Sequence, residues 1–597
     1  MITENVRLKK ENLDLRLQVS TLSNQLQVLE SKQKLLESEN IRLITELNKL
    51  NKKSNSILIK NNVTHNPMTK ITFAPFRPPA LNLKDDTHPE DELDLQWGDV
   101  NQGKNLIGAN IFEEFLIIGN SDIENKKPEI LYKYTNSLNN DEMITILNFA
   151  FPFGIKHQKI TDSAHNQGNY GELNEILLIS NSLFQHRRNA FVILLKNDED
   201  LFKSSVSQLK LFINGERSEM RKVSLLETSN PNHFKYCICF LVRDYIAVPA
   251  SPQTQKNKKN GKITADQDFE YIETEKVLCF ITYYPFIRFF TDIILSILNY
   301  FKINKLKCLQ DYGEPDSKIF SKIDAKFLSD EMNQDLKNIL FNIHKMPLPC
   351  FNSLLVFPNF ENLSGMLTFQ IPDEHESSFL EVEWTSVVCF KIFRPEEFLM
   401  ILLSILLEKK IVFFTRNLNL LTSTILTFLH AMRPFLWAFP VIMNLPRELF
   451  EMMSSPLPLL IGVNKDFEFF KSEKIEALFS DCVFIFLDEE NKIHDFKNIE
   501  VDVLSQFYHL LSYKIHEKLS NIPNLKDSEA PKAIKEVLNI LRKEIEKELI
   551  PLEIKNTKVL NIEEITENFG KDKDRFVKKF VKTQMLSCHM QKIIEKK

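Results

Sequence analysis

The chain has 597 residues, of which 43% are hydrophobic and 26% are charged, and its formal net charge is -5. These values are ordinary for a soluble globular protein, and they argue against nucleic acid as the main partner, because phosphate binding needs a basic face. The eight cysteines are scattered, no basic-then-apolar signal segment opens the chain, and no apolar run reaches the roughly 18 residues of a membrane span, so we expect a reduced, cytoplasmic protein.

Residues 1–58 are predicted to form a parallel coiled coil. Leucine recurs at every seventh position, at Leu8, Leu15, Leu22, Leu29, Leu36, Leu43 and Leu50. We assign these leucines to the d positions of heptads, and asparagine recurs among the matching a positions, at Asn5, Asn12 and Asn40. Leucine at d favours two parallel strands, and asparagine at a disfavours other registers and higher oligomers. We therefore expect a homodimer through this segment. The alternative is an amphipathic helix that packs on the chain's own globular body.

Residues 59–105 are predicted to be a linker, because they are polar, rich in proline and lack sustained periodicity. Residues 106–270 then carry short strand-like runs, including Ile111 to Ile118, Phe191 to Leu195 and Tyr236 to Val242. This range includes an insertion at residues 251–264. Its lysines could bind an anionic membrane surface, but a solvated polar loop is the better explanation.

Cys237 and Cys239 lie two residues apart, so they should share one face of a strand. No paired histidine or cysteine group stands at zinc-ligand spacing elsewhere in the chain. We therefore expect buried structural thiols here and no metal site.

The segment from Arg394 to Val463 contains the clearest structural signals. Pro395 followed by two glutamates predicts the first turn of a helix, and the apolar run from Phe398 to Leu407 leaves that helix without a polar face. Strands are predicted at Ile411 to Thr415 and at Phe439 to Met443, separated by a helix that Pro434 must end. A strand, a helix and a strand at this spacing indicate a βαβ unit in a parallel sheet.

Two later segments are predicted to be amphipathic helices. Each shows apolar residues at helical spacing, Ile534, Leu538, Leu541, Ile545 and Leu549 in the first and Phe576, Phe580, Val581 and Met585 in the second. Core packing accounts for both stripes.

The sequence lacks the common motifs of covalent and nucleotide chemistry. The chain contains no GxxxxGK[ST] loop, no GxGxxG after a strand, no GxSxG elbow and no HExxH motif. We therefore expect no catalytic nucleophile, no metal and no cofactor.

Six segments, taken in order, resemble the DENN domain family. FEEFLIIG at 112–119 resembles the upstream segment, and RFVKKFVKTQM at 575–585 resembles the last helix of the downstream segment. The central segment starts with KVLCFITYYPFIRFF at 276–290 and continues with LLEKKIV at 406–412, RPFLW at 433–437 and SPLPLLIGV at 455–463. The resemblance implies an α/β fold with a longin-like module at 106–270, a central DENN module with a mostly parallel sheet at 271–490 and a downstream helical region at 491–597. The coiled coil precedes these modules.

The same resemblance implies a guanine nucleotide exchange factor for a Rab-type small GTPase in membrane traffic, working in the cytoplasm with peripheral contact to vesicle membranes. Members of the family hold the GTPase between the two modules, so the partner-binding candidates are Phe151 and Pro152, Tyr284, Pro285 and Arg288, and Arg416 and Asn417. Packing or turn formation is the competing explanation for each of them. Two other functions stay open, a GTPase-activating protein that uses Arg416 or Arg288 and a non-catalytic scaffold.

Overall fold

The computed structural model describes the chain in fourteen segments, at residues 110–120, 127–159, 189–196, 225–249, 269–311, 330–346, 350–357, 367–383, 385–465, 467–487, 494–497, 505–526, 529–550 and 573–595. All of them belong to the compact unit Gln96–Lys597. The predicted coiled coil with its leucines, the linker at 59–105 and the loop at 251–264 lie outside the described residues, so these three assignments stay predictions.

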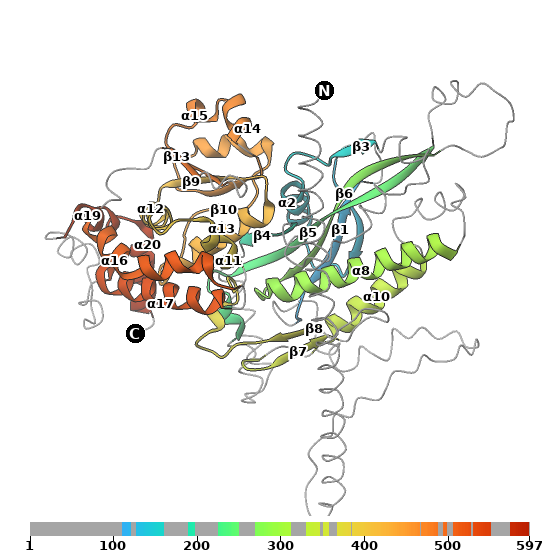
Figure 1. Cartoon of the computed structure of the whole chain (residues 1–597), viewed down its shortest axis with the longest axis horizontal. Coiled ribbons are helices and arrows are strands. Elements are labelled where there is room, and N and C mark those ends of the chain that lie inside the picture. The colour runs from blue at the N-terminus through green and yellow to red at the C-terminus, as the bar shows by residue number, and fades with distance from the viewer. Residues whose placement is uncertain are drawn as a thin grey trace, which may run out of the picture. The chain divides into compact units, whose positions relative to one another are not determined.

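The first half of the unit is built on an antiparallel sheet, drawn in blue to green in Figure 1. Its strands are β1 (Glu114–Gly119), β2 (Glu129–Tyr134), β3 (His157–Lys159), β4 (Ala190–Lys196), β5 (Phe234–Pro249) and β6 (Phe269–Thr282). The strand order is β2-β1-β6-β5-β4, and β3 pairs with β6. Because β6 lies between β1 and β5, this sheet extends past residue 270, where the sequence placed a module boundary.

Both faces of the antiparallel sheet are covered. Successive residues of β1 alternate between two buried clusters, as the period of two in a strand requires: Phe115 and Ile117 face one cluster, and Leu116 and Ile118 face the other. Helix α2 (Asn140–Ala150) packs on the second cluster. Helices α8 (Ile287–Asp311) and α10 (Asp330–His344) belong to the first, together with the hairpin of β7 (Leu354–Phe357) and β8 (Leu367–Gln370).

The second half contains a mostly parallel sheet, as expected. Its strands are β9 (Lys410–Phe414), β10 (Val441–Ile442), β11 (Leu460–Val463), β12 (Cys482–Leu487) and β13 (His494–Lys497), in the order β10-β11-β9-β12-β13. Only the β12-β13 pair is antiparallel. The predicted strand-helix-strand unit is present, but β11 lies between its two strands. β11 fits there because position 462 is glycine: a Cβ would lie 2.3 Å from the Met443 carbonyl oxygen.

Three helices pack around this sheet: α11 (Thr385–Ile392), α12 (Pro395–Leu406) and α13 (Leu418–Ala431). Two of them, α12 and α13, were predicted from the sequence. Pro395 opens α12, and the Glu397 carboxylate accepts a hydrogen bond from the Arg394 backbone N–H at 2.9 Å. The second predicted strand is shorter than expected, since β10 has only two residues.

Short helices lie between the strands and between the longer helices that follow them. The short ones are η2 (Ser377–Phe379), η3 (Arg447–Ser454), α14 (Phe467–Ser472), α15 (Ile475–Leu478) and η5 (Ile522–Asn524), and the longer ones are α16 (Gln506–Asn521) and α17 (Ala530–Leu549). All five apolar residues of the stripe predicted on α17 are buried. No helix in the described residues is both long and apolar enough to cross a bilayer.

The end of the chain forms two helices instead of the single one predicted over 575–585. They are α19 (Arg575–Phe580) and α20 (Gln584–Glu595). The apolar residues Phe576, Phe580 and Met585 are nevertheless all buried. Glu408, just after α12, accepts a hydrogen bond from the Met585 backbone N–H at 2.7 Å, so it caps the start of α20 and ties it to the second sheet's module.

Candidate partner-binding site

Helix α2 begins at a complete capping box. The Asn139 side-chain oxygen accepts from the Glu142 backbone N–H at 2.8 Å, and the Glu142 carboxylate accepts from the Asn139 N–H at 3.1 Å. The same carboxylate also binds Lys235 on β5. Local capping therefore starts the helix, and an ion pair holds its first turn on the antiparallel sheet.

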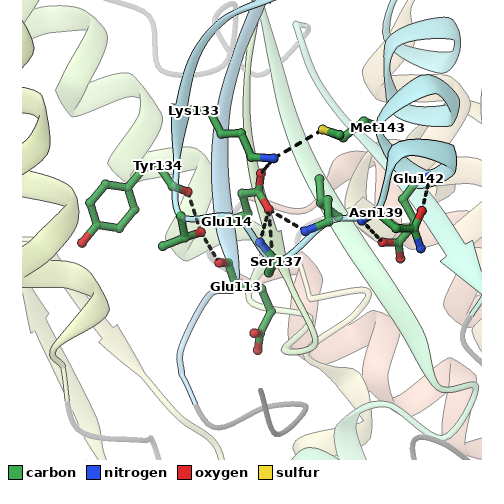
Figure 2. Close-up of polar contacts among 10 residues, drawn as sticks. Glu113, Glu114, Lys133, Tyr134, Ser137, Asn139, Glu142 and Met143 are labelled. Atoms are coloured by element: carbon green, nitrogen blue, oxygen red, sulfur yellow. Dashed lines mark hydrogen bonds and ion pairs between the residues drawn. The ribbon is translucent and has the colours of Figure 1, made fainter. Parts of the chain in front are cut away.

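The chain that leads into α2 is fixed by a buried carboxylate on β1. Figure 2 shows Glu114 next to Ser137 in this connection: one carboxylate oxygen accepts from the backbone N–H groups of Ser137 and Leu138 and from the Ser137 hydroxyl, each at 2.9 Å. Lys133 on β2 lies 3.0 Å from the other oxygen. Because Glu114 is fully buried, these contacts replace the water that an ionised carboxylate would otherwise need.

The other end of α2 meets the second sheet. The Phe149 carbonyl oxygen accepts from the Asn444 side chain at 3.1 Å, and the Pro152 carbonyl oxygen accepts from the Arg447 backbone N–H at 3.2 Å. Gly154 ends this turn with a φ of 76°, a conformation that favours glycine. Since Asn444 and Arg447 follow β10, the turn packs against the carboxyl end of a parallel strand. Open α/β sheets commonly bind ligands at this edge.

Three phenylalanines from separate segments meet at this turn. Phe153 comes from the turn itself, Phe450 from η3 and Phe469 from α14, and their ring centroids are 5.8 to 6.2 Å apart. The Lys465 ammonium lies 4.0 Å from the centre of the Phe153 ring. All three rings are only partly buried. We call Phe153, Phe450, Phe469 and Lys465 the aromatic joint.

The loop after β9 lies at the same edge of the parallel sheet. Asn417 caps α13 by accepting from the Leu420 backbone N–H at 3.0 Å, and Asn419 donates to the Ala190 carbonyl oxygen on β4 at 3.2 Å. Leu418 belongs to the same buried cluster as Phe151. Arg416 is exposed to solvent at this place. The loop therefore contacts the antiparallel sheet while it presents a cation at the surface.

The seven residues proposed from the sequence fall into two groups. Phe151 and Pro152 are buried in the turn after α2, and Arg416 and Asn417 lie in the loop after β9, so these four residues share one edge of the parallel sheet. The other three residues, Tyr284, Pro285 and Arg288, are located elsewhere.

Tyr284 and Pro285 are buried near the start of α8, where the Tyr284 ring stacks on Phe286. Burial raises the pKa of Tyr284. Arg288 is exposed on α8, and its guanidinium lies 3.8 Å from the Asp292 carboxylate. Packing in the first core cluster accounts for Tyr284.

Nothing in the sequence groups Phe450, Phe469 and Lys465 with the turn. Phe153 directly follows the predicted residues Phe151 and Pro152, but its aromatic partners lie about 300 residues later in the chain. No periodic pattern links residues that meet only through tertiary packing.

A second contact between the two halves is buried and ionic. The Tyr236 hydroxyl on β5 donates to Glu381 at 3.1 Å, and the Arg433 guanidinium, just after α13, lies 3.0 Å from the other Glu381 oxygen. Arg433 also donates to the Ser378 carbonyl oxygen at 3.1 Å. Burial raises the pKa of Glu381 and lowers that of Arg433, while each ion opposes the shift of the other. We call Tyr236, Glu381 and Arg433 the buried network.

The thiols in the described part of the chain are placed for packing. Cys237 and Cys239 share a face of β5, as predicted, and the Cys239 sulfur lies 3.3 Å from that of Cys279 on β6. Burial raises the pKa of all three thiols, which makes them poor nucleophiles at neutral pH. Within the described residues, no group of three or more His, Cys, Asp or Glu side chains could hold a metal ion.

Comparison with known proteins agrees with this architecture. Residues 273–489 match the DENN (AEX-3) domain. Over 222 residues, 35% of its length, the chain is 26% identical to the MAP kinase-activating death domain protein of Caenorhabditis elegans, and over 243 residues, 38% of its length, it is 25% identical to the protein of the same name from Mus musculus. Each match spans 15% of the relative.

Proposed function

Since this chain carries a DENN (AEX-3) domain at residues 273–489, we propose that it is a guanine nucleotide exchange factor for a Rab-type small GTPase. The sequence resemblance to this family, from residue 112 to residue 585, supports the same function. We further propose that the protein acts in membrane traffic, in the cytoplasm and at vesicle surfaces, as a dimer through residues 1–58.

Exchange requires no covalent chemistry from the protein. The factor must bind the nucleotide-free GTPase more tightly than the GDP-bound form, so that the nucleotide leaves when the complex forms. A thousandfold faster release needs about 4 kcal/mol of such preference. A few well-packed contacts of the kind found at interface hot spots can supply that amount.

The observation that supports a binding surface is the aromatic joint. Its rings come from both halves of the unit and are only partly buried, and the exposed Leu449 lies beside Phe450 in η3. Aromatic and arginine side chains dominate binding energies at protein interfaces. Arg416 provides such a side chain at the same edge of the sheet. A partner bound here would contact the turn after α2 and the parallel sheet together.

The direct test is the release of labelled GDP from a panel of purified Rab proteins by the full chain. We expect acceleration for at least one Rab, preferred binding to its nucleotide-free form, and dissociation of the complex by excess nucleotide. Phe450→Ala should lower the exchange rate by about 30-fold if the ring is a hot spot worth about 2 kcal/mol. Tyr513→Ala is the matched control, because Tyr513 is an aromatic residue with 86% exposure on α16.

The exposed position of Arg416 also favours one alternative, a GTPase-activating protein that inserts an arginine. Under that alternative, Arg416→Ala should abolish nearly all stimulated phosphate release. Under exchange, the same change should cost about 1 to 2 kcal/mol of binding at most, the value of one interface hydrogen bond. If a Rab binds but neither GDP release nor hydrolysis is accelerated, the protein is a scaffold and the exchange proposal is wrong.

A further inference from the structure

Helix α19 and the turn that follows it have two chemically opposite faces. Phe576, Val577 and Phe580 are buried against the body. Four basic residues lie on the other face, at the i, i+3, i+4 and i+7 positions that share one side of a helix: Arg575, Lys578, Lys579 and Lys582. Arg575, Lys578 and Lys582 are exposed, and Lys579 is partly exposed. We call these four residues the basic stripe.

The basic stripe is held firmly on the body. Asp574 caps two helices at once: one oxygen accepts from the Val577 backbone N–H at 2.9 Å, and the other accepts from the Phe507 N–H at the start of α16 at 3.1 Å. The Phe576 ring stacks on Phe507 at 5.4 Å, and the Phe580 ring lies 5.0 Å from Phe435. The one carboxylate next to the stripe in sequence is therefore engaged with backbone amides.

The stripe contrasts with the charge of the whole chain. Residues 573–595 contain six lysines and arginines and two acids, although the full chain has a net charge of -5. Lys573 has a local acidic neighbour, with its ammonium 3.9 Å from Glu548. A cationic face on an acidic protein would orient the molecule toward an anionic surface.

We propose that the basic stripe docks the protein on membranes that contain anionic lipid. Several long cationic side chains on one helical face match the diffuse negative charge of a bilayer surface, and each residue near the surface contributes about fivefold in affinity. Single-stranded nucleic acid would also need aromatic platforms for its bases. None of the large apolar side chains that are exposed in the described residues lies on α19 or α20, so a lipid surface is the better match.

The test is co-sedimentation of the full chain with vesicles of phosphatidylcholine, either alone or with about 30% phosphatidylserine, at about 0.1 M salt. We expect binding only to the anionic vesicles, and weaker binding as salt is raised. Lys578→Glu with Lys582→Glu should reduce this binding by about 30-fold or more, because each lysine is worth about fivefold. Lys526→Glu with Lys543→Glu is the matched control: both lysines are exposed and lie outside the basic stripe, Lys526 after η5 and Lys543 on α17, and the charge change is the same.

Three results would overturn the proposal: equal binding to neutral vesicles, an equal loss in the control variant, or binding to single-stranded poly(U) at least as tight as to anionic vesicles at the same salt. The Lys578→Glu, Lys582→Glu variant should keep the wild-type melting temperature. It should also keep the wild-type rate of GDP release in solution without vesicles. The membrane-docking proposal and the exchange proposal can therefore be refuted independently of each other.

Discussion

Replacing Glu381 by glutamine should destabilise the protein more than any exposed ion-pair mutation. The change removes the negative charge of the buried network and keeps the size of the side chain. Arg433, with 7% of its surface exposed, would then be a buried cation without a counter-ion. Removal of one partner from a buried pair costs about 3 to 5 kcal/mol, whereas an exposed pair is worth about 0 to 1 kcal/mol.

Two companion variants separate charge from hydrogen bonding. Tyr236→Phe removes one neutral donor to Glu381 and leaves the ion pair in place, so it should cost only about 1 kcal/mol. The double variant Glu381→Leu with Arg433→Met removes both charges and should cost less than Glu381→Gln alone, because no unpaired ion stays in the core.

The measurement is urea unfolding of each variant, followed by tryptophan fluorescence, with the m-value compared with the wild type. We expect a lower midpoint for Glu381→Gln at an unchanged m-value. A loss below about 1 kcal/mol would refute the reasoning, because it would be the value of a solvent-screened pair. A double variant as unstable as the sum of its single variants would show that the two residues are not coupled.

Four further predictions concern stability, pH and assembly. Phe580→Ala should cost about 3 to 5 kcal/mol, since the ring is fully buried, and an unchanged melting temperature would show that the last helices are not part of the core. Glu408→Ala should cost about 1 kcal/mol in urea unfolding through loss of the cap on α20, while Glu408→Gln keeps an acceptor and should cost less; equal costs would argue against capping. Burial lowers the pKa of His430 well below its usual value, so unfolding takes up a proton and stability should fall by about 1.4 kcal/mol per unit as pH drops below about 6.5, until the folded-state pKa is reached. His430→Gln should flatten that slope between pH 7 and pH 5, and a slope equal to the wild type would contradict this origin. A peptide of residues 1–58 should sediment as a dimer at tens of micromolar (an order-of-magnitude condition), and a monomer would sink the coiled-coil prediction.

The sequence predicted the buried centre of the second half well, because its signals are local. Pro395 and the glutamates after it favour the start of α12, and a helix that is apolar on almost every side is stable only between other layers of the fold. The order of strands was not predictable in the same way. β11 lies between β9 and β10 although it follows both in the chain, and no spacing rule encodes which neighbours a strand will choose.

The candidate site was only partly predictable for the same reason. Phe151 and Pro152 were candidates because the family resemblance places the GTPase between the two modules, and the structure puts them in the turn after α2. Tyr284 and Pro285 were candidates on the same ground, yet both are buried near the start of α8, where Tyr284 belongs to the first core cluster. Composition alone cannot separate an aromatic turn that binds a partner from one that fills a core, because both need large apolar side chains.

The buried network and the aromatic joint, two of the contacts between the halves, differ in the free energy that it would cost to open them. The buried network would expose or isolate charges if it separated, at a cost of several kcal/mol. The aromatic joint is partly solvated already, and aromatic pairs of this kind contribute about 0.5 to 1.5 kcal/mol beyond the area they bury. A partner that packs against Phe153 and Phe450 could therefore replace their mutual contacts at little cost while the network holds the halves together. The aromatic joint is therefore the contact at which a partner can gain binding free energy without unfolding the protein.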